Sequence, residues 1–286
     1  MSNVSMDLVK ELREKTQVGM MDCKKALAET NGDIEKAIEL LRKKGSAVAA
    51  KRAGNAMDNG RIESFVSADH KQGALVEVGC ETDFSANTAA MKEFVIAAAQ
   101  EAVTKKIGEA HALMTGSSKV ADTLNELIAK IAEKIQVTNV AMFAVEGNGL
   151  VNAYIHPGST VGVIVELATS GAGDVEVLKQ TARDVCMHIA VRSPLCVNPA
   201  DLDPAILAKE KEIAEEQLKT SGKPAAIIEK IMLGKVSKYY EDVCLAKQKY
   251  IKNEDLNIEQ HLNEIGKKLG ITVVVKRFAR FGIGGK

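Results

Sequence analysis

Large aromatic residues are scarce in this sequence. The 286-residue chain has no tryptophan, six phenylalanines and four tyrosines. Because aromatic side chains normally dominate protein cores and interfaces, an aromatic residue outside an apolar pattern is a candidate for function. Long apolar runs are missing as well, since no stretch of about 18 apolar residues occurs. The start, MSNVSMDLVKELREKT, does not read as a signal peptide, so we expect a cytoplasmic protein with no membrane partner.

Charge and cysteine content argue against a nucleic-acid-binding protein, a zinc protein and a disulfide-linked protein. The chain has 38 basic and 38 acidic residues, a formal net charge of zero. A nucleic-acid-binding protein usually carries a basic surplus, so we expect no direct nucleic-acid partner. The five cysteines are scattered along the chain without a C-x-x-C pair, at positions 23, 80, 186, 196 and 244. This spacing predicts buried, reduced thiols rather than a zinc site or a disulfide framework.

Motifs of covalent chemistry are not found. The sequence contains no P-loop, GxGxxG, HExxH or GxSxG pattern. His188 follows Cys186 by two residues in DVCMHIAV, and helical residues two apart point in different directions. They would make a poor nucleophile and base. A thiol enzyme using Cys23 or Cys186 is a rival hypothesis, but Cys23 lies at a buried position of its helical pattern. We expect no enzyme, no cofactor and no metal.

Residues 1–55 predict a three-helix domain followed by a linker. Leu8, Val9 and Leu12 share one helical stripe, and Cys23 and Leu27 belong to a second. A third helix is expected from an N-cap at residue 33 to a stop at the glycine at residue 45.

An internal repeat follows. Residues 65–80, FVSADHKQGALVEVGC, align with residues 154–169, YIHPGSTVGVIVELAT, at a constant offset of 89. Each copy reads as strand, turn, strand, and each is followed by a polar loop and a helix. The sequence therefore predicts an α+β fold with two related subdomains that have antiparallel sheets and packed helices. We assign 56–144 to the first, and 145–200 with 257–286 to the second.

Residues 201–256 predict an inserted helical hairpin, a short antiparallel coiled coil turning at TSGKP. A projecting hairpin is usually an interaction or dimerisation element, which leaves open a homodimer. The alternative is that the hairpin folds back onto its own domain.

The stretch LVEVGCETDFSANTAAM, residues 75–91, places an aromatic residue at a polar corner. The apolar run ends at Cys80, and Asp83 and Phe84 follow. The second repeat has SGAGDVEV at this point, so the loop has diverged where the strands have not. This divergence favours a function for the first loop. The alternative is that Asp83 caps a turn and Phe84 folds into its own core.

These segments together resemble the bacterial translation elongation factor Ts family. The resemblance rests on LVKELREKTQVGMMDCKKALAETNGDIEKAI, VEVGCETDF, the repeated hairpins, SGKPAAIIEKIMLGKVSKYYED and RFARFGIG, in that order. It implies a ubiquitin-associated-like N-terminal domain, a core of two related subdomains and a helical hairpin. It also implies a guanine-nucleotide exchange factor that binds GDP-bound elongation factor Tu and performs no covalent chemistry.

The resemblance further implies which residues contact the partner. The loop residues Thr82, Asp83 and Phe84 would enter it near its magnesium and phosphate site. The other implied contacts are Met20, Met21, Lys24, Ile131 and His188. Met20 shares a stripe with buried positions, so it is either a core residue or a contact. After residue 131 the family often has glycine, whereas this chain has Ala132.

Overall fold

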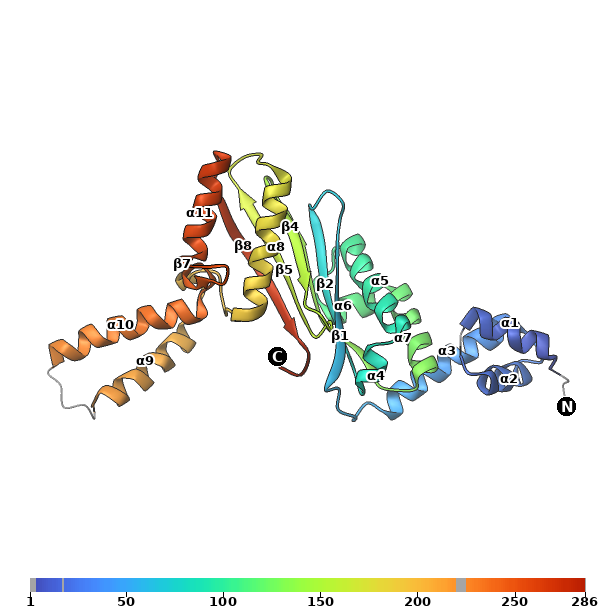
Figure 1. Ribbon diagram of the computed structural model, residues 1–286. Coiled ribbons are helices and arrows are strands. Elements are labelled where there is room, and N and C mark those ends of the chain that lie inside the picture. The colour runs from blue at the N-terminus through green and yellow to red at the C-terminus, as the bar shows by residue number, and fades with distance from the viewer. Residues whose placement is uncertain (1–3, 17, 220–224, 286) are drawn as a thin grey trace.

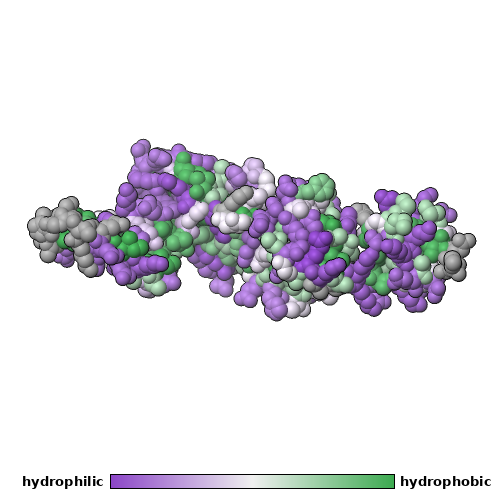
Figure 2. Space-filling view, turned by 90° about the horizontal axis from the view of Figure 1, so that it is seen from below, coloured by the Kyte–Doolittle hydropathy of each residue, from purple (hydrophilic) through white to green (hydrophobic). Residues whose placement is uncertain are grey.

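The fold is built from two antiparallel sheets placed between terminal helical elements (Figure 1). The structure is a computed structural model that describes residues 4–16, 18–219 and 225–285. The N-terminal helices lie at one end of the elongated molecule and a helical hairpin at the other. The face seen from below is mainly polar, and its apolar residues gather in separate patches (Figure 2). Within the described residues, no helix is both long and apolar enough to cross a membrane.

Three helices form the N-terminal bundle: α1 (Met6–Thr16), α2 (Met20–Glu29) and α3 (Ile34–Lys51). Most residues of the predicted stripes are buried in it: Val9, Leu12, Cys23 and Leu27 are all at 0% exposure. Leu8 is half-buried and Met20 is exposed. Asp33 caps α3 as expected, because its Oδ1 accepts a hydrogen bond from the Lys36 N–H at 3.1 Å.

The predicted helix stop at Gly45 is wrong, since α3 continues to Lys51. A Cβ at Gly45 would lie 2.1 Å from the carbonyl oxygen of Asn125 in α7 (Ser118–Ile131). The glycine therefore lets two helices cross at close range. An ion pair between Arg42 and Glu126, at 2.6 Å, joins the same two helices.

Each copy of the repeat forms a hairpin, as predicted, and gains a third strand. The first sheet has the order β1-β2-β3 and the second β4-β5-β8, all antiparallel. Both central strands have a register shift at the equivalent place, after Glu77 and after Glu166. The bounds are β1 (Asn59–Val66), β2 (Gln72–Cys80), β3 (Ile135–Ala144), β4 (Gly149–Ile155), β5 (Val161–Thr169) and β8 (Val273–Gly282).

The two sheets pack face to face, and helices cover their outer faces (Figure 1). A Cβ on Gly73 would lie 2.9 Å from Cγ1 of Val151, and one on Gly162 would lie 2.5 Å from Cγ2 of Ile62. Both pairs are equivalent under the 89-residue offset, so the interface repeats itself with pseudo-two-fold symmetry. The covering helices are α5 (Ala89–Lys105), α6 (Ala110–Gly116) and α7 on the first sheet, and α8 (Val175–Arg192) and α11 (Ile258–Leu269) on the second. These features confirm the α+β class.

The helical hairpin consists of α9 (Pro204–Lys219) and α10 (Ala225–Val243), which project from the second sheet (Figure 1). This orientation contradicts the alternative that the hairpin folds back. The predicted TSGKP turn lies outside the described residues. Strand character returns in β8, but a small sheet and α11 come first. The remaining elements are η1 (Pro199–Asp201), η2 (Leu245–Lys247), β6 (Lys249–Tyr250), β7 (Asn253–Asn257) and η3 (Ile283–Gly285).

Candidate functional site

Phe84 is presented on the surface directly after β2. Its side chain is 82% exposed. The alternative that this ring folds into its own core is therefore wrong. An exposed phenylalanine in a chain with six of them leaves apolar area in water that a partner could bury.

A short helix fixes the direction of the ring. The helix α4 (Asp83–Ala86) begins after Thr82, whose Oγ1 accepts a hydrogen bond from the Ser85 N–H at 3.2 Å. Asp83 is not the N-cap of this helix. Its Oδ1 accepts a hydrogen bond from the adjacent Phe84 N–H, at 2.8 Å. Ser85 and Ala86 are buried, so the inner side of α4 is anchored while Asp83 and Phe84 remain outside.

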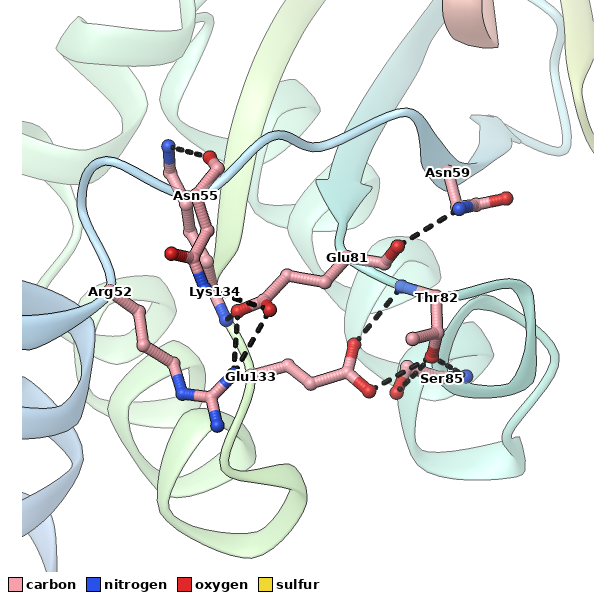
Figure 3. A network of polar contacts seen from close by, with 8 residues as sticks. All are labelled: Arg52, Asn55, Asn59, Glu81, Thr82, Ser85, Glu133 and Lys134. Carbon is pink, nitrogen blue, oxygen red and sulfur yellow. Dashed lines mark hydrogen bonds and ion pairs between the residues drawn. The ribbon is translucent and has the colours of Figure 1, made fainter.

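Glu133, in the turn after α7, holds the start of this helix (Figure 3). Its Oε2 accepts a hydrogen bond from the Thr82 N–H at 3.2 Å, and its Oε1 accepts one from Thr82 Oγ1 at 2.9 Å. Hydrogen bonds to a charged acceptor are stronger than neutral ones. The loop is therefore tied to an element 51 residues away in the sequence.

Glu81 ties the linker after α3 to the same corner (Figure 3). Its carboxylate accepts hydrogen bonds from Arg52 Nη1 at 3.0 Å, from Asn55 Nδ2 at 2.9 Å and from the Lys134 N–H at 2.6 Å. Its carbonyl accepts from Asn59 Nδ2 at 2.9 Å. The hydrogen bond from the Lys134 N–H, followed by those from Asn55 and Arg52, lowers the pKa of Glu81. This carboxylate network is a preformed support beneath the exposed loop.

The hydrogen bonds that Glu81, Glu133 and Arg52 make around the loop could not be predicted from the sequence alone. Their importance depends on contacts between segments that are distant along the chain. The only signal in the sequence is that Glu81 adjoins the polar corner.

The implied N-terminal contacts are all on the surface of α2. Met20 is 43% exposed and Met21 is 66% exposed; Lys24 is exposed as well. The alternative that Met20 is a core residue is therefore wrong. Figure 1 places α2 at the N-terminal end, apart from α4. These residues and the loop do not form one cluster, and a partner would have to span both.

Ile131 lies close to the loop support. It is half-buried against the core of the first subdomain, and it stands two residues before Glu133. Between them, Ala132 ends α7 in the left-handed conformation, with φ 61° and ψ 31°. Glycine adopts this conformation without a Cβ clash, so Ala132 is at a position that favours glycine.

His188 differs from the expectation of a partner contact, because its side chain is fully buried at 0% exposure. Its Nε2 lies 3.0 Å from Oε1 of Gln248, and its Nδ1 accepts the Ile251 N–H at 3.4 Å. This pattern assigns the proton to Nε2. Burial is the main reason that the pKa of His188 is lowered to about 4. The neutral imidazole is a core group that no partner reaches in this conformation.

No further chemistry is assembled near the loop. All five cysteines are buried, as predicted. In the described part of the chain, no three His, Cys, Asp or Glu side chains are grouped so as to hold a metal ion. What the structure shows at this corner is an exposed aromatic residue beside a carboxylate, on a short anchored helix.

Comparison with known proteins agrees with the sequence motifs. A family model described as Elongation factor TS matches residues 81–285. The chain is 43% identical over 285 residues to elongation factor Ts of Clostridium perfringens, covering 98% of this chain and 93% of that protein. It is 42% identical over 288 residues to that of Nautilia profundicola (99% and 94% covered). The identity to the protein of Clostridium botulinum is 41% over 287 residues (98% and 93% covered). The chain belongs to the elongation factor Ts family.

Proposed function

We propose that the chain is a guanine-nucleotide exchange factor in translation elongation. Its partner is GDP-bound elongation factor Tu, and it performs no covalent chemistry. The observation that carries the proposal is the ring of Phe84, 82% exposed beside Asp83 on a loop anchored by Glu133. The family membership and this geometry support the same function.

In this proposal the Asp83-Phe84 pair enters the partner near its magnesium and phosphate site. The ring wedges between apolar side chains and displaces the elements that hold the metal. The carboxylate adds negative charge where metal and phosphate are bound, which disturbs an ion-dependent network. The polar support under α4 matters because a preordered loop loses little conformational entropy on binding.

The wedge alone is too weak to release the nucleotide. Burying one phenylalanine side chain yields about 1.5–3 kcal/mol, whereas shifting a two-state equilibrium ten-thousandfold needs about 5.5 kcal/mol. Other contacts must hold the partner while the loop acts. We propose Met20, Met21 and Lys24 on α2, and Ile131 beside the loop, as those contacts.

A docking module without exchange activity is the rival function. Such a module has no need for an exposed aromatic residue next to a carboxylate, so the loop geometry favours exchange. Homodimerisation through the hairpin, and the lack of any nucleic-acid or membrane partner, stay predictions.

Thermodynamic linkage supplies the test. If the chain weakens GDP binding to the partner by some factor, GDP must weaken the binding of the chain by the same factor. We expect the release of fluorescent GDP from elongation factor Tu to accelerate when the chain is added. We also expect the affinity of the chain for the partner to fall as GDP is titrated. Binding that leaves the GDP release rate unchanged would show a docking module instead.

A further inference from the structure

Two cysteines face each other at the neck of the helical hairpin. Cys196 lies between α8 and α9, where the chain leaves the second subdomain, and Cys244 follows α10, where the chain returns. Their two Sγ atoms are 3.5 Å apart, within hydrogen-bonding distance for sulfur. The Cys196 thiol is also 3.2 Å from the Asn198 carbonyl oxygen. Both cysteines are buried, at 9% and 0% exposure.

Backbone hydrogen bonds already hold together the two segments that carry these thiols. Cys196 and Cys244 are partners in a parallel β-bridge. The Leu195 N–H donates to the Val243 carbonyl at 2.8 Å, and the Leu245 N–H donates to the Cys196 carbonyl at 2.9 Å. Neighbouring strands lie about 4.8 Å apart, within the roughly 4.4–6.8 Å that separates the Cα atoms of disulfide partners. Bond formation therefore needs the sulfurs to approach to about 2.05 Å, with little movement of the backbone.

The other three cysteines are in different surroundings. The thiols of Cys23, Cys80 and Cys186 each donate to a backbone carbonyl, of Val18, Thr82 and Asn152 respectively. Among the described residues, the pair at the neck is thus the one place where a thiol has a second sulfur as its partner.

We propose that Cys196 and Cys244 are an oxidation site that forms an intramolecular disulfide when the protein meets a peroxide. The Cys196 sulfur, the more exposed of the two, attacks one peroxide oxygen and becomes a sulfenic acid, and one water is released. The Cys244 sulfur then displaces the hydroxyl group as a second water. Two thiols lose two electrons and two protons, and one hydrogen peroxide is reduced to two waters.

The surroundings of the two thiols should make their oxidation slow. Burial raises the pKa of Cys196, and it is also the main cause that raises the pKa of Cys244 to about 12. Only the thiolate attacks, so brief exposure to oxidant leaves the pair reduced and sustained exposure links it. The link would tie the end of α10 to the segment after α8 and fix the neck of the hairpin.

The experiment uses the full chain under native conditions. The protein is incubated with hydrogen peroxide, unfolded, and labelled with a maleimide. We expect the number of labelled thiols to fall from the five free cysteines to three. We also expect a mass loss of two hydrogens and one cross-linked peptide pair containing Cys196 and Cys244. The reaction should accelerate as the pH is raised.

Two variants make the test specific. Cys196→Ser should keep all its remaining thiols free of disulfide, whereas Cys186→Ser, a matched change at a buried thiol elsewhere, should still lose two. If Cys196→Ser fails to fold, the cross-linked peptide from the wild-type chain is sufficient to show which two cysteines are linked. Five labelled thiols after sustained oxidation, or a link that maps to another pair, would overturn the proposal.

Discussion

Glu133 accepts two hydrogen bonds from Thr82, one from the backbone N–H at 3.2 Å and one from Oγ1 at 2.9 Å. Because Thr82 is also the N-cap of α4, the carboxylate of Glu133 holds the residue from which this helix begins. The exposed ring is therefore held by a residue that need not touch the partner itself.

Replacing Glu133 should impair exchange without unfolding the protein. We expect Glu133→Ala to lower the stimulated GDP release rate about tenfold, since a loop that must be ordered on binding loses about 1.4 kcal/mol of its effect. Glu133→Gln keeps one acceptor oxygen and should restore part of the rate. The matched control is Glu109→Ala, because Glu109 is an exposed glutamate that makes no side-chain cap. Equal rates for Glu133→Ala and Glu109→Ala would show that the support is unimportant.

Glu81 should make folding stability depend on pH. Its pKa is lowered in the folded state, chiefly by the hydrogen bond from the Lys134 N–H. A carboxyl with a lowered folded pKa stabilises the fold above its unfolded pKa, about 4.3, and this contribution is lost as the pH falls through the folded pKa. Urea denaturation of the wild type and Glu81→Gln should therefore differ most at neutral pH, and the difference should shrink below about pH 4.3. A difference that is independent of pH would contradict the ionic role.

Gly45 should not tolerate alanine, although it is within a helix. A Cβ there would meet the Asn125 carbonyl at 2.1 Å, so α3 and α7 must separate. We expect Gly45→Ala to lower the free energy of unfolding by about 1–3 kcal/mol. A Cβ added at Gly234 in α10 would meet no atom within 4 Å, and Gly234→Ala should stabilise the protein by up to about 1 kcal/mol. Chemical denaturation measures both changes in the free energy of unfolding. If both variants changed it in the same direction, the close crossing of α3 and α7 would be refuted.

Ala132 is a site where glycine should stabilise the chain. Its φ of 61° is in the left-handed region, which disfavours residues with a Cβ by about 1–2 kcal/mol. Glycine also has a more flexible unfolded state, so we expect a net gain of about 0.5–1 kcal/mol for Ala132→Gly. Ala121→Gly, in the same helix, should instead destabilise by about 1 kcal/mol. Thermal unfolding of both variants measures the contrast, and a loss of stability for Ala132→Gly would contradict it.

Much of the fold could be predicted because the sequence repeats itself. The 89-residue offset, with Gly73 matching Gly162 and Glu77 matching Glu166, is sufficient to predict two related hairpins. The amphipathic stripes similarly predict the N-terminal helices. The proposed boundaries after residues 55, 144, 200 and 256 stay predictions.

What could not be predicted depends on contacts between distant segments. Gly45 has the local signal of a helix stop, and only the position of Asn125 shows that it serves a helix crossing. For His188, the family resemblance implies a partner contact, whereas the structure buries its side chain completely. Its spacing from Thr181 and Val185 places it on the buried stripe of α8, where all three are at most 4% exposed, and this signal is present in the sequence.

The measurement that tests the central claim most directly is GDP release from elongation factor Tu with Phe84→Ala. Val175→Ala is the matched control, because Val175 is 55% exposed at the corresponding corner of the second repeat. We predict that Phe84→Ala lowers the stimulated GDP release rate about 10- to 150-fold with folding intact, because the burial of one phenylalanine side chain is lost. Val175→Ala should stay near the wild-type rate. A Phe84→Ala protein that releases GDP as fast as the wild type would contradict the account.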